Sequence, residues 1–196
     1  MNNSCLVLEG GGLRGAFTSG ALEYLLEQDY SFSRVVGVSA GACTGASYVS
    51  KQHGRNWTVN IEYPSDSRYM GLRHLLRSGS YFNIPFVFGD IPRLLVPYDE
   101  ETALSNPSEF DVVTTSLRTG KSVVFTKDKM RMIGITKALV ASSSIPLMAR
   151  PAEIEGELYF DGGVSDSIPV KYALDRHEKA VVVLTRPRGY RKGKTS

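Results

Sequence analysis

The sequence predicts an α/β protein built on a mostly parallel sheet, and two observations support this. Two short apolar strands, Leu6-Val7-Leu8 and 34–37, lie close together near the start of the chain. Each is followed by a glycine-containing turn and then by a segment with helical character. Successive strand–helix–strand units favour parallel strands joined by right-handed crossovers. Because no internal repeat or domain boundary precedes the end of the chain, we expect one domain over 1–185 and a basic tail over 186–196.

The remaining elements follow from local patterns. Apolar residues from Phe17 to Leu26 recur at helical spacing and predict a helix that runs to about Gln28. The small-residue run 40–47 predicts a second helix that packs very close to its neighbours. Later in the chain we expect a hairpin over 111–115 and 122–126, a helix over 133–140, a strand over 157–160, a short helix starting at Pro169 and a last strand over 179–185.

The middle of the chain is less regular. Residues 52–98 carry four prolines and predict at most one short helix, over 70–77. A long segment of this kind is often a lid or a binding surface. Its aromatic side chains are therefore either a surface for an acyl chain or ordinary core; they are Trp57, Tyr63, Tyr69, Tyr81, Phe82, Phe86, Phe88 and Tyr98.

Composition and charge exclude several classes of function. The net charge is +3, but five of the 23 Lys and Arg residues lie in 186–196, which holds no acidic residue. The rest of the chain is slightly acidic, so a nucleic-acid partner is not expected. Two cysteines and three widely separated histidines fit neither a disulfide framework nor a metal site, so we expect no metal and no cofactor.

No apolar run approaches the ~20 residues of a membrane span. The first residues also lack the charged and apolar regions of a signal peptide. We therefore expect a cytoplasmic protein in which Cys5 and Cys43 stay reduced. The oligomeric state is not indicated by any pattern in the sequence.

Ser39 is the candidate nucleophile. It lies in Gly37-Val38-Ser39-Ala40-Gly41, a G-x-S-x-G motif between a predicted strand and a predicted helix. Gly37 and Gly41 permit the tight turn that presents a serine hydroxyl, and the helix N-terminus behind it favours a developing oxyanion. The alternative is a serine that only caps the helix.

The run Gly10-Gly11-Gly12-Leu13-Arg14-Gly15 has two interpretations. It matches the dinucleotide-binding G-x-G-x-x-G pattern, which predicts an acidic residue at the end of the second strand. That strand instead ends in Gly37-Val38-Ser39, which favours the other interpretation, an oxyanion hole of exposed backbone N–H groups. In an α/β sheet both turns would open at the same edge.

Two residues are candidates for the base that activates Ser39. The order Ser39, Asp161, His177 matches that of an α/β-hydrolase triad, but only a short segment precedes Ser39 and His177 lies in a charged helix end. Asp161 ends an apolar strand and is followed by Gly162 and Gly163, which suits a carboxylate acting directly on Ser39. Its ordinary pKa of ~3.9 makes it a weak base unless burial raises it. The alternative for Asp161 is a plain turn.

These three motifs, in this order, resemble those of the patatin-like phospholipase family. The run Ala141-Ser142-Ser143-Ser144-Ile145-Pro146 also resembles a family block that precedes the Asp. The resemblance extends from Leu6 to about residue 185 and implies a three-layer α/β/α sandwich around a mostly parallel sheet. It further implies a bacterial serine lipid acyl hydrolase with Ser39 as nucleophile and Asp161 as proton acceptor. The oxyanion hole would comprise Gly11, Gly12, Leu13, Arg14 and Gly15, while Gly10, Gly37, Gly41, Gly162 and Gly163 complete the motifs.

The resemblance implies an acyl ester of a lipid as substrate and a covalent acyl-enzyme. The basic tail over 186–196 either gives peripheral contact with an anionic membrane surface or is a solvated, disordered end. Bacterial relatives commonly extend further, so we expect a short member or a truncated chain that lacks part of the cover over the acyl site. Two other functions stay open: a non-catalytic lipid-binding module on the same fold, and a dinucleotide-dependent oxidoreductase.

Overall fold

The computed structural model describes residues 2–187 and 189–191, which contain a seven-stranded mixed sheet. The strand order is β5-β6-β3-β2-β1-β7, and β4 also pairs with β3. Four strands are parallel: β1 (Asn2–Leu8), β2 (Phe32–Val38), β3 (Glu109–Ser116) and β7 (Ala180–Val183). Antiparallel pairing adds β4 (Ser122–Phe125), β5 (Ala152–Ile154) and β6 (Glu157–Asp161). The predicted α/β class is confirmed, and β5 is an addition to the predicted strands.

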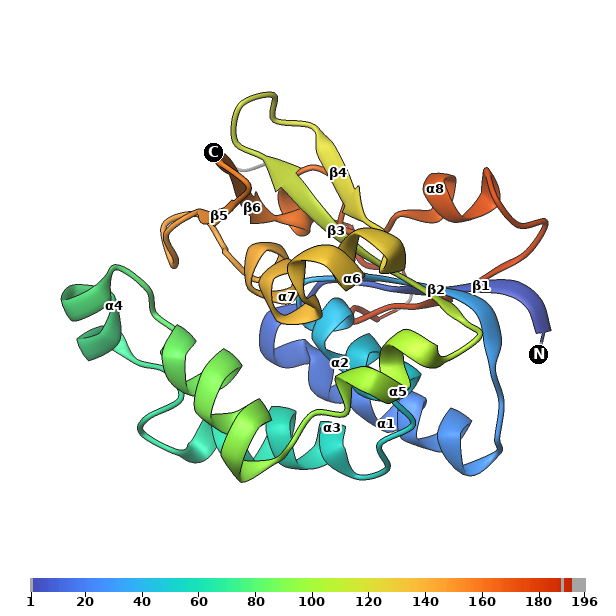
Figure 1. Ribbon diagram of the computed structural model, residues 1–196, viewed down its shortest axis with the longest axis horizontal. Helices are drawn as coiled ribbons and strands as arrows, with labels where there is room; N and C mark the ends of the chain where they lie inside the picture. The colour runs from blue at the N-terminus through green and yellow to red at the C-terminus, as the bar shows by residue number, and fades with distance from the viewer. Residues whose placement is uncertain (1, 188, 192–196) are drawn as a thin grey trace.

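Helices cover the two faces of the sheet unequally (Figure 1). The larger layer comprises α1 (Gly15–Glu27), α2 (Ala40–Val49), α5 (Glu100–Ser105), α6 (Lys127–Ile133) and α7 (Ile135–Ser142). The short helix α8 (Val170–Leu174) covers the opposite face.

Alternating side chains of the strands build the two halves of the core. Leu6 and Leu8 of β1 join the large cluster under α1 and α2, whereas Val7 between them packs with Ala173 of α8. This is the alternation that a strand buried on both faces requires. The result is the three-layer arrangement.

The segment 52–98 is more regular than predicted. It forms α3 (Arg55–Trp57), the π-helical turn η2 (Thr58–Glu62), η3 (Tyr63–Ser65), α4 (Leu72–Ser78) and the long π-helical segment η4 (Phe86–Leu95). Tyr69, Phe86 and Ile91 form a small core of their own, which stabilises this segment beside the main layer. Figure 1 shows α4 projecting from the body of the molecule.

The predicted helix over 133–140 corresponds to α7, and the helix before it, α6, was not predicted. Gly134 separates α6 from α7 with φ +90°, a conformation that few residues other than glycine adopt, so the chain turns between them. Within the described residues, no helix is both long and apolar enough to cross a bilayer. Of the predicted tail, residues 188 and 192–196 lie outside the described part of the chain.

Candidate active site

The ends of β2 and β6 meet along one edge of β3. Val38, the last residue of β2, pairs with Val113, and Asp161, the last residue of β6, pairs with the next residue, Thr114. The opposite edge of β3 is occupied by β4, which pairs with both Val113 and Thr114. Because β6 is antiparallel to β3 and β2 is parallel to it, the two strands run toward each other and bring Ser39 and Asp161 together.

Ser39 occupies a strained turn between β2 and α2. Its backbone has φ 54° and ψ −124°, outside the conformations that serine ordinarily adopts. A Cβ at Gly37 would come within 2.5 Å of the Ala42 Cα, and one at Gly41 would overlap the Leu8 carbonyl. Both glycines of the G-x-S-x-G motif are therefore required by close backbone packing around the turn.

Ser142 at the end of α7 holds this turn in place. The Ser39 N–H donates to Ser142 Oγ at 2.7 Å, and Ser142 Oγ donates to the Val113 carbonyl at 2.7 Å. Ser142 is fully buried. The sequence showed Ser142 only as part of the 141–146 run, without a role, because its hydrogen bond to Ser39 joins residues 103 positions apart.

The Asp161 carboxyl is buried and hydrogen-bonded. It is 5% exposed and accepts the Gly163 N–H on Oδ1 at 2.7 Å. Burial raises its pKa above the ordinary value, and hydrogen bonds from the Ser39 side chain and the Gly163 N–H oppose that rise. A Cβ at Gly162 would overlap the Val113 carbonyl, so this glycine lets the chain leave β6 close to β3. The Asp161 carboxyl therefore lies within hydrogen-bonding reach of the Ser39 side chain.

The glycine loop lies beside Ser39 at the N-terminus of α1. Its residues form the 3-10 turn η1 (Gly12–Arg14), and Gly12 has φ +55°. The Gly10 N–H donates to the Ser167 carbonyl, and the Arg14 and Gly15 N–H groups donate within the turn. Among the described residues, the N–H groups of Gly11, Gly12 and Leu13 have no hydrogen-bond partner, and of these three residues only Gly12 and Leu13 line the cleft that holds Ser39. They are the loop donors available to an oxyanion.

The predicted loop residues differ in their positions. Gly12, Leu13 and Gly15 line the same cleft as Ser39. The exposed Arg14 is not among the residues that line the cleft. A Cβ at Gly11 would come within 2.7 Å of Thr185 Oγ1, so Gly11 is a packing position beneath the loop.

Glu9 fixes the strand end that leads into the loop. Its carboxylate accepts the Thr185 backbone N–H and, at 2.9 Å, the Thr185 hydroxyl. This pair connects the glycine loop to the segment that follows β7. The sequence pattern did not single out either residue, because the contact joins the two ends of the chain.

A largely apolar cleft extends from Ser39 between α2 and the 52–98 segment. It encloses about 1060 Å³, including the part open to solvent. Its lining includes four of the aromatic residues considered above, Tyr69, Phe82, Phe88 and Tyr98. Phe86 and Tyr63 instead pack in the small core of the segment, and Trp57 is exposed. The segment therefore supplies both the cleft wall and the core behind it.

Cys43 lies one helical turn after Ser39 and also lines the cleft. Its Sγ is 3.5 Å from Ser143 Oγ, and burial raises the pKa of the thiol to about 11. A thiol that stays protonated is a poor nucleophile. Ser39 is therefore the nucleophile that this geometry favours.

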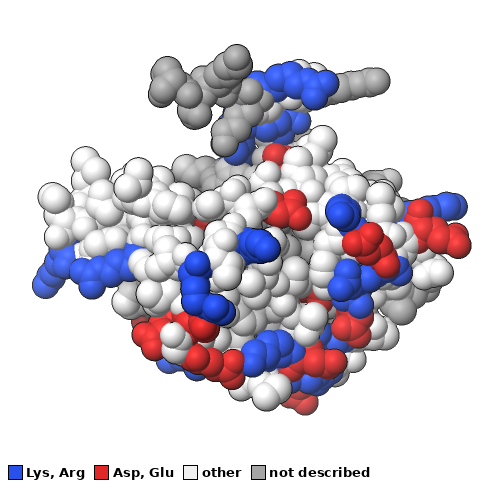
Figure 2. All heavy atoms as spheres, turned by 90° about the horizontal axis from the view of Figure 1, so that it is seen from above, with Lys and Arg blue, Asp and Glu red and all other residues white. Residues whose placement is uncertain are grey.

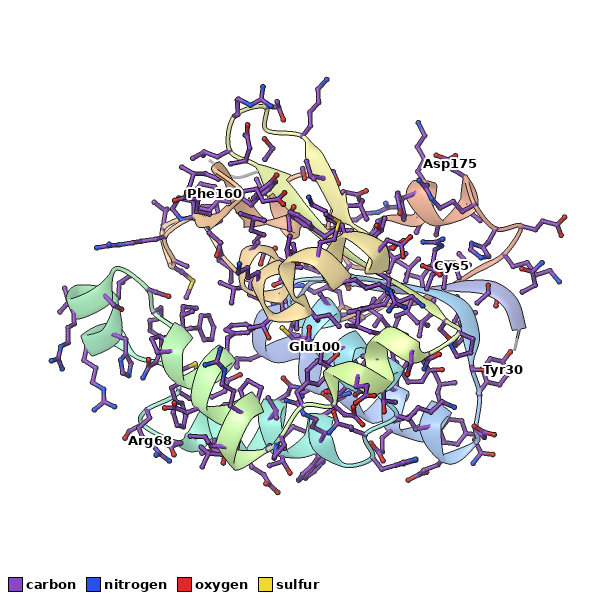
Figure 3. The ribbon with its side chains drawn as sticks, in the orientation of Figure 1. Cys5, Tyr30, Arg68, Glu100, Phe160 and Asp175 are labelled. Atoms are coloured by element: carbon purple, nitrogen blue, oxygen red, sulfur yellow. The ribbon has the colours of Figure 1, made fainter. Side chains whose placement is uncertain are left out.

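His177 lies away from Ser39, beyond α8. Burial and the neighbouring Arg34 and Arg176 lower its pKa, and its Nδ1 is buried with no partner among the described residues. Arg34 pairs with the buried Asp111, which also accepts the Tyr172 hydroxyl. Figure 3 shows Asp175, two residues before His177, on the α8 side of the sheet. The structure therefore does not bring His177 to Ser39 as a triad would require.

Comparisons with known proteins show the family and the fold of the chain. Residues 6–174 match the family described as Patatin-like phospholipase. The chain is 30% identical to the Escherichia coli protein YjjU, covering 91% of this chain and 50% of that protein. It is 28% identical to human patatin-like phospholipase domain-containing protein 6, covering 93% of this chain and 13% of that protein. A viral relative, probable lipid hydrolase 463L of Invertebrate iridescent virus 6, is 24% identical over 89% of this chain and 64% of its own.

A solved structure shares the fold. VipD from Legionella pneumophila superposes with a TM-score of 0.55 at 16% sequence identity, over 93% of this chain and 49% of that one. The chain thus spans about half the length of VipD and of YjjU. Taken with the paired strand ends, the glycine loop and the match over 6–174, these comparisons show that the chain belongs to the patatin-like phospholipase family.

Proposed function

We propose that the protein is a serine lipid acyl hydrolase in which Ser39 is the nucleophile and Asp161 the general base. The observation that carries this proposal is the buried Ser39–Asp161 pair at an apolar cleft, beside free N–H groups of the glycine loop. Family membership and a relative named as a probable lipid hydrolase support a lipid ester as the substrate. The catalytic unit we propose is 1–185.

In the first half-reaction the enzyme is acylated. Ser39 Oγ attacks the ester carbonyl carbon while its proton passes to the Asp161 carboxylate. The carbonyl oxygen becomes an oxyanion and accepts hydrogen bonds from the N–H groups of Gly12 and Leu13. The intermediate then expels the alcohol, which takes the proton from Asp161, and leaves an acyl ester on Ser39.

In the second half-reaction water releases the acyl group. Asp161 removes a proton from the water as its oxygen attacks the acyl carbon, and the same N–H groups stabilise the second oxyanion. When the intermediate collapses, Asp161 returns the proton to Ser39 Oγ and the fatty acid leaves. The cycle needs no histidine and no metal ion.

The surroundings of Asp161 suit this role. An exposed carboxylate is too weak a base to assist serine effectively at neutral pH. Burial raises the pKa of Asp161 and so strengthens it as a base. The hydrogen bonds from Ser39 and Gly163 oppose this and favour the carboxylate form that must accept the proton.

Exposed leucines beside the cleft support the proposal that the protein contacts a lipid surface. Leu13 lines the cleft and is 54% exposed, and Leu147, close to the lining residue Ile145, is 96% exposed. The α4 helix adds Leu72 and Leu76, at 69% and 88% exposed. It is joined to the same region by the hydrogen bond from Tyr81 N–H to the Met148 carbonyl.

Basic residues accompany these leucines. Arg73 and Arg77 lie on α4. Arg150 lies beside the end of this helix, since a Cβ added at Gly79, the residue that follows α4, would come within 2.5 Å of Arg150 Nε. Figure 2 shows a largely uncharged surface on the side that carries α4, bordered by Lys and Arg. Exposed leucines and arginines together suit peripheral binding to an anionic membrane.

The test of the proposed function is labelling with a fluorophosphonate together with hydrolysis of p-nitrophenyl esters. Wild-type protein should be labelled and active, and Ser39→Ala should lose both. Ser143→Ala is a matched control, because Ser143 lines the same cleft but does not contact Asp161 in the proposed chemistry. Failure of wild-type protein to react would favour a non-catalytic lipid-binding module. Tight binding of NAD(H) instead would favour the oxidoreductase hypothesis.

A further inference from the structure

Arg55 brings a guanidinium into the cleft at a distance from Ser39. It begins α3, and its Nη1 donates to Ser47 Oγ at 2.9 Å while Nη2 donates to the Val96 carbonyl at 3.4 Å. The guanidinium carbon lies 5.0 Å from the centre of the Tyr98 ring. Arg55, Ser47 and Tyr98 all line the cleft. They form a polar end to a lining that is otherwise mostly apolar.

The positive charge of Arg55 has no acidic partner. Among the described residues it forms no ion pair, and its buried Nε has no hydrogen-bond partner. Arg34, whose side chain is 18% exposed, is by contrast paired with Asp111. Burial lowers the pKa of Arg55, but a guanidinium stays protonated at physiological pH.

A cation without an acidic partner in an apolar cleft is costly, so its presence there calls for an explanation. The bonds to Ser47 and Val96 use two of the five N–H donors of the guanidinium. Both acceptors and the Tyr98 ring are neutral, so no opposite charge faces the guanidinium. An anionic ligand group in the cleft would supply the missing partner, with charge-assisted hydrogen bonds.

The geometry of α2 sets the distance between the two ends of the cleft. Ser39, Cys43 and Ser47 lie at successive intervals of four residues and all line the cleft. At 1.5 Å per residue, Ser39 and Ser47 are about 12 Å apart along the helix axis. An extended alkyl chain advances ~1.3 Å per carbon at ordinary bond lengths and angles, so about nine carbons span this distance.

We propose that Arg55 binds a carboxylate at the far end of the acyl chain, so that the preferred acyl groups have about nine carbons and a terminal carboxylate. The substrate class is then a lipid ester of a dicarboxylic acid, with one carboxyl esterified and the other free. This proposal rests on the proposed function for the hydrolytic step. The binding of the free carboxylate by Arg55 does not depend on that step.

The first test compares two esters that differ only at the chain end. These are the mono-p-nitrophenyl ester of nonanedioic acid and p-nitrophenyl nonanoate. Wild-type protein should show kcat/KM about tenfold or more higher for the first, mainly through KM, because a charge-assisted pair forms only there. The preference should decline for shorter and longer dicarboxylic acids. Equal kcat/KM values for both esters at every chain length would overturn the proposal.

Variants assign the preference to Arg55. Arg55→Met should abolish the preference while the neutral ester is still hydrolysed, and Arg55→Lys should keep part of it. A merely structural role would reduce activity on both esters equally. Arg118→Met is the matched control, because Arg118 is exposed and pairs with Glu157 away from the cleft lining. A preference that survives in Arg55→Met overturns the proposal.

A binding measurement separates this proposal from the proposed function. Calorimetry with Ser39→Ala should show nonanedioate monomethyl ester binding more tightly than methyl nonanoate, with the difference lost in Ser39→Ala/Arg55→Met. If no ester is hydrolysed but this difference is observed, the proposed function fails and the Arg55 site stands. A preference seen only with a phosphate headgroup on the alcohol side would overturn the Arg55 assignment, since the anion would then not be on the acyl chain.

Discussion

Ser142 ties Ser39 to the central strand of the sheet. Its hydroxyl accepts the Ser39 N–H and donates to the Val113 carbonyl, both at 2.7 Å. Val113 is also the residue paired with Val38. The end of β2, the turn at Ser39 and the end of α7 are therefore all held to β3 at Val113. The strained backbone of Ser39 is held in place by this arrangement.

Removing the Ser142 hydroxyl should therefore impair catalysis more than binding. Ser142→Ala leaves the buried Ser39 N–H and the Val113 carbonyl without their partner, which should cost about 1–3 kcal/mol of unfolding free energy. We also expect kcat to fall with little change in KM, because Ser39 loses its support. Stopped-flow or steady-state ester hydrolysis and urea unfolding would measure both effects. Ser143→Ala provides the control, and equal kcat in both variants would contradict this role for Ser142.

Asp161→Asn should inactivate the protein and stabilise it at neutral pH. Loss of a general base typically costs ~10²–10⁴ in rate. Burial raises the pKa of Asp161 in the folded protein, so the carboxyl destabilises the fold once pH rises through that pKa. The amide keeps an oxygen for the Gly163 N–H and removes this charge. Thermal unfolding should show a higher Tm for Asp161→Asn at pH 7 and a smaller difference as pH falls and wild-type Asp161 becomes protonated.

The pH dependence of activity distinguishes Asp161 from His177 as the general base. With Asp161 as the base, kcat/KM should rise with pH through an apparent pKa above 3.8 and should keep the same profile in His177→Ala. A profile that loses its rise in His177→Ala, with Asp161→Asn still active, would instead place the base at the histidine.

Much of the site was predictable because its motifs are local. The strained turn at Ser39 needs Gly37 and Gly41 as immediate neighbours, and the chain leaving β6 needs Gly162, so short patterns reveal them. The βαβα start of the fold follows from the same local signals. Helix α6 over 127–133 was not predicted, and the start predicted at residue 133 crosses Gly134, where the backbone turns.

The remaining parts depend on contacts between distant residues. Nothing in the sequence sets the direction of β6, yet its antiparallel pairing with β3 is what points Asp161 toward Ser39. Ser142, the Glu9–Thr185 pair and the position of Arg55 against Ser47 likewise follow from how whole elements pack. A single sequence does not contain these distances, so neither the anchor of the nucleophile nor the polar end of the cleft could be predicted from it.

Alanine substitutions at two helical glycines, Gly41 and Gly20, should change the stability of the protein in opposite directions. A Cβ at Gly41 would overlap the Leu8 carbonyl and lie 2.8 Å from that of Glu9, so Gly41→Ala should destabilise the protein by about 3 kcal/mol. Gly20 lies within α1, and a Cβ there meets nothing within 4 Å. Gly20→Ala should therefore stabilise by up to ~1 kcal/mol through helix propensity. Chemical denaturation of both variants checks the pair, and a tolerated Gly41→Ala would contradict the tight packing under the nucleophile turn.

Replacing the exposed leucines of α4 should weaken binding to lipid without affecting the reaction itself. Leu72→Ser/Leu76→Ser removes apolar surface that would be buried in a bilayer, at roughly 1.5–3 kcal/mol for each fully buried leucine. Sedimentation with vesicles of anionic phospholipid should show at least tenfold weaker binding, while hydrolysis of a soluble p-nitrophenyl ester stays unchanged. Met132→Ser is the control, because Met132 is 77% exposed on α6 and does not line the cleft. If the double variant and the control bind vesicles equally well, α4 is not the lipid-facing surface.

High salt should weaken wild-type binding as well, because Arg73 and Arg77 on the same helix would contribute through their charge.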